Sequence, residues 1–269
     1  MVVAVLAIVM LVACGSSASP TVAPVSGTTI PATSQPPTTT EPAPPALPPK
    51  TGVTVRTVRG IDVWQPTGSG GPWPLIAFAH GYNVTPQFYD RLLRVWAAAG
   101  YVVAAPASNE PAAIRAAIDI LSNDDAVDPT RVGVAGHSDG ATIAAHIAFD
   151  PAEHDSRVRA VVALVSDPLD NLGPLSGPPL FLEQGDSDTI SPQSNGDSFY
   201  EQVTSSKWYL LLHGAGHSPP ITERTQWTPI VDQSTIAFLD RYLAGRTADD
   251  AAIVVAGRQD PNLASFFVG

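Results

Sequence analysis

The chain has 269 residues, a formal net charge of −11 and a single cysteine, Cys14. An acidic chain without a basic stripe argues against nucleic-acid binding, and one cysteine excludes a fold held by intramolecular disulfides. The composition is uneven. Only from residue 51 does the mixed apolar and charged pattern of a globular domain begin, which leaves about 200 residues for one packed domain over 51–269.

The N-terminal segment reads as an export signal. Residues 2–13 form an apolar run, which is shorter than the roughly 20 residues that span a bilayer. The run ends in Leu-Val-Ala before Cys14, and this resembles the lipobox of bacterial lipoproteins. The resemblance implies that residues 1–13 are removed and that Cys14 carries the lipid that anchors the exported protein to the cell envelope. Since no Lys or Arg precedes the run, an ordinary signal peptide or an incidental cysteine remains the alternative.

Residues 14–50 follow as a predicted linker. Pro, Thr, Ser and Ala dominate this stretch, and residues 15–50 hold ten of the 27 prolines. Such a composition offers too little apolar surface to offset the entropy of ordering the chain. We therefore expect an extended tether that holds the domain away from the surface to which Cys14 is attached.

From residue 53, short apolar runs alternate with helical patterns. Strands are expected at 53–58, 61–64, 75–79, 101–105, 131–135, 159–165, 179–183 and 208–213. Helices are expected at 88–99, 111–121, 140–149, around 193–203 and at 231–243. Strands separated by helices predict an α/β fold with a mostly parallel sheet covered on both faces. The first two strands are expected at the edge, the short segment between 165 and 179 leaves little or no room for a lid, and no element is predicted after residue 250.

The strongest chemical signal is Gly-His-Ser-Asp-Gly at 136–140. It follows an expected strand and precedes an expected helix, which is the context of a G-x-S-x-G nucleophile elbow. Gly136 and Gly140 meet the need for neighbours without bulk around the tight turn at Ser138. The alternative is a glycine-rich turn that merely precedes a helix.

A serine nucleophile needs a general base and an acid that orients it. His217 lies in a Gly-rich loop directly after the last expected strand, whereas its rival His213 ends the strand itself. Asp188 follows the strand 179–183 by a few residues and can reach an imidazole from the side, and Asp167 after the preceding strand is the alternative. Asp186 is expected to bond nearby amides in its turn.

An acyl-transfer site also needs donors for the developing oxyanion. The backbone N–H groups of Tyr82, in the loop after strand 75–79, and of Asp139, directly after the serine, are the expected donors. His80 is expected to support that loop. The Asp139 carboxylate either begins the helix as a first-turn acid or disfavours anionic substrates. The sequence has no cluster with metal-ligand spacing and no phosphate loop, so no metal or cofactor is expected.

Together, the segments 74–82, 136–140, 185–192 and 214–217 resemble the α/β-hydrolase superfamily over roughly residues 53–245. The resemblance is to the branch of bacterial polyester hydrolases and cutinases, chlorophyllase-like proteins and dienelactone-hydrolase-like enzymes. It implies a serine hydrolase that cleaves small-molecule or lipid carboxylic esters through an acyl-enzyme.

The departures from these relatives bear on the substrate. Dienelactone hydrolases carry a cysteine where this chain has Ser138, and polyester hydrolases usually carry a methionine where it has Asp139. The aromatic clamp and the C-terminal disulfide of the polyester hydrolases have no counterpart here, so polyester cleavage is not expected. Two other functions remain open: an acyltransferase with the same triad, and a non-catalytic surface binding module.

Overall fold

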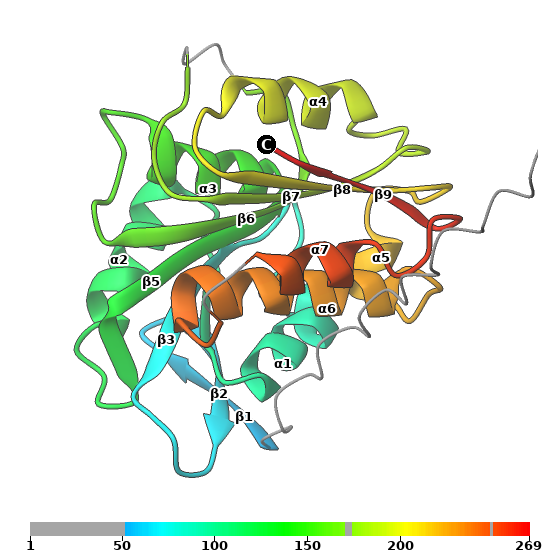
Figure 1. Cartoon of the computed structure of the whole chain (residues 1–269). Coiled ribbons are helices and arrows are strands. Elements are labelled where there is room, and N and C mark those ends of the chain that lie inside the picture. Colours follow the sequence, from blue (N-terminus) through cyan, green and yellow to red (C-terminus); the bar gives the residue numbers. More distant parts are fainter. Residues whose placement is uncertain (1–51, 170–173, 248–249) are drawn as a thin grey trace, which may run out of the picture. The chain divides into compact units, whose positions relative to one another are not determined.

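The computed structural model describes residues 52–169, 174–247 and 250–269 (Figure 1). The predicted signal peptide, Cys14 and linker lie outside these residues. The described strands are β1 (Gly52–Val58), β2 (Ile61–Thr67), β3 (Trp73–Ala79), β4 (Val102–Pro106), β5 (Val127–Ser138), β6 (Val158–Ser166), β7 (Leu180–Gly185), β8 (Lys207–Leu212) and β9 (Ala264–Val268). The described helices are η1 (Pro86–Tyr89), α1 (Asp90–Ala98), α2 (Pro111–Leu121), α3 (Asp139–Phe149), α4 (Gln193–Gln202), α5 (Pro219–Thr222), α6 (Thr228–Leu239), η2 (Asp240–Ala244) and α7 (Ala251–Gly257).

The described strands form one sheet in the order β1-β2-β4-β3-β5-β6-β7-β8-β9. The six strands from β4 to β8 in this order are parallel, and β1, β2 and β9 are antiparallel to their neighbours. The expected α/β fold with a mostly parallel sheet is therefore confirmed. The expectation that the first two strands both lie at the edge is wrong for β2, which pairs with β1 on one side and β4 on the other. The outer edge of its backbone pairs with β1, while Ile61, Val63 and Trp64 are buried in the cores on the two faces of the sheet.

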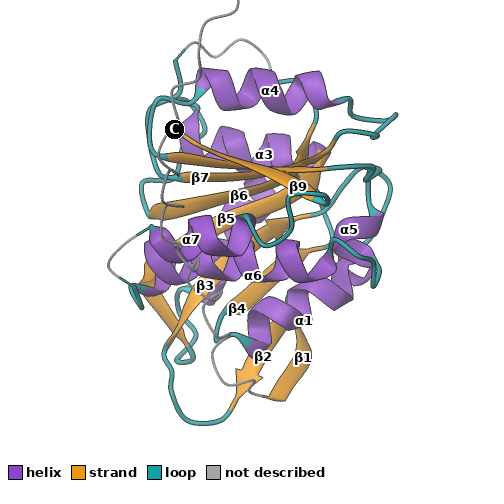
Figure 2. Cartoon of the chain, turned by 45° about the vertical axis from the view of Figure 1, so that its right-hand side comes forward, coloured by secondary structure: helices purple, strands orange, loops and turns teal. Residues whose placement is uncertain are grey.

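Helices cover both faces of the sheet, and Figure 2 shows α3 and α4 on one side with α1, α6 and α7 on the other. Each face has its own apolar core, and side chains of α2, α3 and α4 complete one while those of α1, α6 and α7 complete the other. The central strands are apolar on both faces because helices exclude water from each side; all of β4 and β7 is buried.

The structure adds elements after residue 250 that the sequence pattern does not predict. Helix α7 packs beside α6, and β9 pairs with β8 to form the far edge of the sheet. Phe267 and Val268 at the end of β9 are about half exposed, so the strand lacks the continuous apolar run that marks a buried one. Edge strands are also short, which weakens their sequence signal further.

Two helices differ from their predicted limits by more than one residue, and one short helix has no counterpart in the prediction. The helix expected at 88–99 begins with the 3-10 turn η1 and becomes α-helical only at Asp90. The helix expected at 231–243 begins at Thr228 and ends in the π-helical turn η2, and α5 was not predicted. The described part of the connection between β6 and β7, residues 167–169 and 174–179, contains no helix. Among the residues described, no helix is long and apolar enough to cross a membrane.

Candidate active site

Ser138 lies on a strained turn between β5 and α3. Its backbone has φ 57° and ψ −125°, a conformation that non-glycine residues adopt only where the surroundings enforce it. A Cβ atom at Gly136 would overlap the backbone carbonyl of Gly140, and one at Gly140 would overlap the carbonyl oxygens of Ala79 and His80. Both glycines of the motif are therefore required by the close approach of backbones, as the sequence predicts.

The sheet register brings the loops of several strands to the serine. In β5, Gly136 pairs with Ala79 of β3, and Ser138 pairs with Ser166 of β6. Because the parallel strands run in the same direction, the loops that follow β3, β5, β6, β7 and β8 all leave the same edge of the sheet. Ligand sites of open α/β sheets lie at this edge.

Ser138, His217 and Asp188 form one hydrogen-bonded group. The Oγ atom of Ser138 lies 3.0 Å from Nε2 of His217, and Nδ1 of His217 lies 2.7 Å from Oδ2 of Asp188. A carboxylate oxygen only accepts, so Nδ1 carries a proton and donates it to Asp188. In the neutral imidazole, Nε2 then presents its lone pair to the Ser138 hydroxyl, which is the arrangement of a general base.

The acid is held in place by its own loop. The side chain of Asp188 is fully buried, and its Oδ1 accepts the backbone N–H groups of Ile190 at 2.8 Å and Ser191 at 3.0 Å. Ser191 in turn donates its hydroxyl to Asp167. The structure therefore brings Asp188 to His217, whereas Asp167 contacts the loop that carries Asp188.

The other candidate residues have partners of their own. His213 lies 3.0 Å from both Asp186 Oδ2 and Ser265 Oγ, at the edge between β8 and β9. Asp186 also accepts the Gly214 N–H at 2.8 Å, the turn contact expected of it. Hydrogen bonds to Asp186 from His213 foremost, and from Gly214 and Ser187, hold the pKa of this carboxyl below its usual range. His80 lies 2.9 Å from the carbonyl oxygen of Gly81 and supports the loop after β3.

The two expected oxyanion donors belong to segments that pack against each other. Tyr82 lies in the loop after β3, and Asp139 is the first residue of α3, where backbone N–H groups have no partner within the helix. The close approach of Gly140 to the carbonyls of Ala79 and His80 fixes α3 against this loop. The Asp139 carboxylate accepts a hydrogen bond of 2.9 Å from the Asn109 side chain. Its place in the first turn of α3 fits the expectation that it begins the helix as a first-turn acid.

One buried acid near the site was not predicted. Glu183 on β7 is only 1% exposed, and within the described residues neither of its carboxyl oxygens has a hydrogen-bond partner. Burial, and then the negative charge of Asp188, raise the pKa of Glu183 to about 8. The side chain is therefore mostly neutral at pH 7. The sequence offers no clear signal for it, because Glu183 stands in an otherwise apolar strand.

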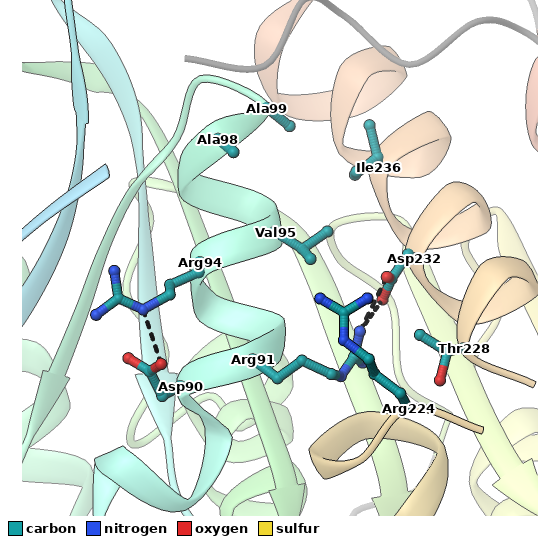
Figure 3. A pocket seen from close by; sticks show the side chains of 10 residues that line it. All are labelled: Asp90, Arg91, Arg94, Val95, Ala98, Ala99, Arg224, Thr228, Asp232 and Ile236. Carbon is teal, nitrogen blue, oxygen red and sulfur yellow. Dashed lines mark hydrogen bonds and ion pairs between the residues drawn. The ribbon is translucent and has the colours of Figure 1, made fainter. Parts of the chain in front are cut away.

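Arg91 of α1 connects α5, which follows His217, to α1 and α6. Arg91 of α1 contacts both carboxylate oxygens of Asp232 on α6, at 2.8 and 2.9 Å (Figure 3). It also donates to the carbonyl oxygens of Ile221 and Pro220 in α5. Arg91 and Asp232 line a cavity of about 470 Å³ between α1 and α6, which none of Ser138, His217 and Asp188 lines.

Ser138, Asp188 and His217 come in this order along the chain, each after a strand of a mostly parallel sheet with helices on both faces, and this arrangement decides the fold. Its fold is that of the α/β hydrolases. Among family models, that of the chlorophyllase family matches residues 51–127, and no curated protein matches the chain. The matched segment contains the Tyr82 loop and ends before Ser138. A match to this family suggests an esterase-like hydrolase. Within the described part of the chain, no group of three or more His, Cys, Asp or Glu residues could hold a metal ion.

Proposed function

We propose that the chain is a serine hydrolase of carboxylic esters. The observation that carries this proposal is the placement of His217 between Ser138 and Asp188, with hydrogen-bond distances of 3.0 and 2.7 Å. The chlorophyllase-family match supports the same class of reaction from a different part of the chain.

The reaction begins with attack of the Ser138 Oγ on the ester carbonyl carbon. Nε2 of His217 takes the hydroxyl proton as the new C–O bond forms, and the carbonyl oxygen becomes an oxyanion held by the N–H groups of Tyr82 and Asp139. Collapse of this intermediate breaks the bond to the leaving alkoxide, which receives the proton from His217. Water then attacks the acyl-enzyme and gives a proton to His217. Cleavage of the bond to Ser138 releases the acid, and the serine recovers its proton from His217. Asp188 stabilises the imidazolium throughout.

Two exposed apolar side chains indicate the kind of ester. Tyr82 is 84% exposed in the loop after β3, and Ile190 is 70% exposed in the loop after β7. Ser138 ends β5, which lies between these strands in the sheet, so the two loops leave the sheet on either side of the serine turn. Burial of apolar groups against them would favour esters with apolar substituents. We therefore propose a neutral or weakly polar ester with an aliphatic or aromatic portion as the substrate class.

The test is hydrolysis of a chain-length series of nitrophenyl esters by the purified full chain. Replacement of Ser138 by alanine should lower kcat by at least about 10⁴-fold, while Ser69→Ala, which removes an exposed hydroxyl in the loop before β3, should leave it unchanged. Product analysis with and without added alcohols separates hydrolysis from acyl transfer. An inactive wild-type protein, or full activity in Ser138→Ala, would contradict the proposal.

We further propose that the enzyme is exported and anchored to the bacterial cell envelope through Cys14. The apolar run 2–13, the small residues before the cysteine and the Pro/Thr-rich residues 15–50 support this. In a bacterial host fed a clickable fatty acid, the wild-type chain should be labelled and sediment with membranes, whereas Cys14→Ser should do neither. Equal labelling of the two would refute the assignment of Cys14.

A further inference from the structure

We propose that Tyr89 and His137 are positioning residues that hold the loop after β3 and the loop after β8 against the nucleophile turn. The inference rests on the proposed function, because it concerns how the same site is kept in its working geometry. Neither residue touches the reacting atoms, and the sequence motif gives no role to the position that His137 occupies.

The two residues join three segments through buried hydrogen bonds. The backbone N–H of Gly81 donates to the Tyr89 hydroxyl at 2.9 Å, and this hydroxyl lies 2.9 Å from Nδ1 of His137. On the other side of the ring, Nε2 of His137 lies 3.0 Å from the backbone carbonyl oxygen of His217. Both side chains are buried, so water does not compete for these bonds.

The chemistry of the partners fixes the direction of every bond. A carbonyl oxygen only accepts, so Nε2 of His137 carries a proton and donates it to His217. The neutral ring has one N–H, so Nδ1 accepts the hydroxyl proton of Tyr89. Burial lowers the pKa of His137 to about 3, which keeps the ring neutral, and burial raises the pKa of Tyr89 to about 12, which keeps its hydroxyl protonated. The three bonds therefore point the same way and polarise one another.

Each bond fixes a residue next to a working part of the site. Gly81 precedes Tyr82, the proposed oxyanion donor, and His137 precedes Ser138. The bonded carbonyl belongs to His217 itself. A Cβ at residue 81 would lie 2.9 Å from the Tyr89 hydroxyl and 3.3 Å from Nδ1 of His137, so only glycine allows this close approach without displacing its neighbours.

His137 also packs directly against the proposed base. Its ring centroid lies 4.7 Å from that of His217, with an angle of 60° between the planes. A charged ring at this distance would oppose the imidazolium that forms on His217 during acyl transfer. The bond pattern keeps His137 neutral, so it holds the base without opposing its charge.

The test uses Tyr89→Phe, which removes the hydroxyl and keeps the ring that packs 4.9 Å from Phe78. Active sites are counted by complete reaction with a fluorophosphonate, so that kcat is expressed per reactive serine. We expect kcat to fall about 10- to 100-fold, because small displacements of catalytic groups have effects of this size, while KM stays within about twofold. The matched control is Tyr101→Phe, which removes another buried hydroxyl, bonded to Asp240 at 2.5 Å on the other side of the fold from the serine turn; it should lower stability and keep kcat.

A second measurement reports the bonds without activity. The imidazole nitrogen resonances of His137 should show the neutral Nε2–H form and stay constant between pH 5 and pH 9. An unchanged kcat per reactive serine in Tyr89→Phe, a change confined to KM or to the number of active sites, or titration of His137 within this range would overturn the inference. If the wild-type chain neither hydrolyses esters nor reacts with the fluorophosphonate, the proposed function fails, and the resonances still decide whether the bonds exist.

Discussion

The buried carboxyl of Glu183 makes the stability of the domain depend on pH. Burial, with a further contribution from Asp188, raises its pKa from 4.5 to about 8 in the folded protein. Between these values the folded state retains a proton that the unfolded state has released, so raising the pH favours unfolding. The stabilisation by the proton is complete below about pH 4.5 and is lost progressively up to about pH 8. At about 1.4 kcal/mol per pH unit, the loss between pH 5 and pH 8 is on the order of 4 kcal/mol.

Replacement of Glu183 by glutamine removes this dependence, because the amide does not ionise. We expect urea unfolding at pH 5 and pH 8 to show a larger fall in the free energy of unfolding for the wild type than for Glu183→Gln. The difference between the two falls should be on the order of 4 kcal/mol. That is a large share of the 5–15 kcal/mol typical of folded proteins (about a quarter or more). Glu201→Gln on the exposed face of α4 is the matched control and should follow the wild type. Parallel curves for wild type and Glu183→Gln would refute the reasoning.

Three further predictions follow from contacts around the site. Asp188→Asn should lower kcat about 10⁴-fold with the fold retained, because the amide favours the wrong tautomer of the histidine; ester assays that show less than a tenfold loss would contradict this. Gly140→Ala should destabilise the protein and abolish activity, since its Cβ overlaps backbone atoms, whereas Gly216→Ala, with no atom of the described residues within 4 Å of its Cβ, should unfold like the wild type. Arg91→Gln removes the two-oxygen contact with Asp232 of α6 and the bonds to the α5 carbonyl oxygens and should cost about 2 kcal/mol in urea unfolding; an unchanged midpoint would show that Arg91 does not hold α5 and α6.

The parallel core of the fold could be predicted from the sequence because its signals are local. The runs at 75–79 and 160–165 are apolar throughout, as strands buried on both faces must be. The antiparallel edges were predicted less well. The place of β2 as an inner strand depends on its pairing with β4, which no local pattern shows, and β9 is half exposed and short.

The grouping of Ser138, Asp188 and His217 could be predicted where chain order and turn chemistry specify it. The glycines at 136 and 140 mark the turn at Ser138, and the loops after the last strands supply Asp188 and His217. His137, Tyr89 and Glu183 could not be found in this way. They come from separate strands and helices, and only contacts across the fold single them out: the two hydrogen bonds of the His137 ring and the burial of the Glu183 carboxyl.

The central claim is that Ser138 is the nucleophile of an ester hydrolase. The most direct measurement is mass spectrometry of the peptide that carries Ser138 after reaction of the folded protein with a fluorophosphonate, compared with the urea-unfolded protein. The adduct should lie on Ser138 alone, form only in the folded state, and parallel the loss of esterase activity. Modification of another residue with Ser138 left free, or activity that persists after complete labelling of Ser138, would contradict the account.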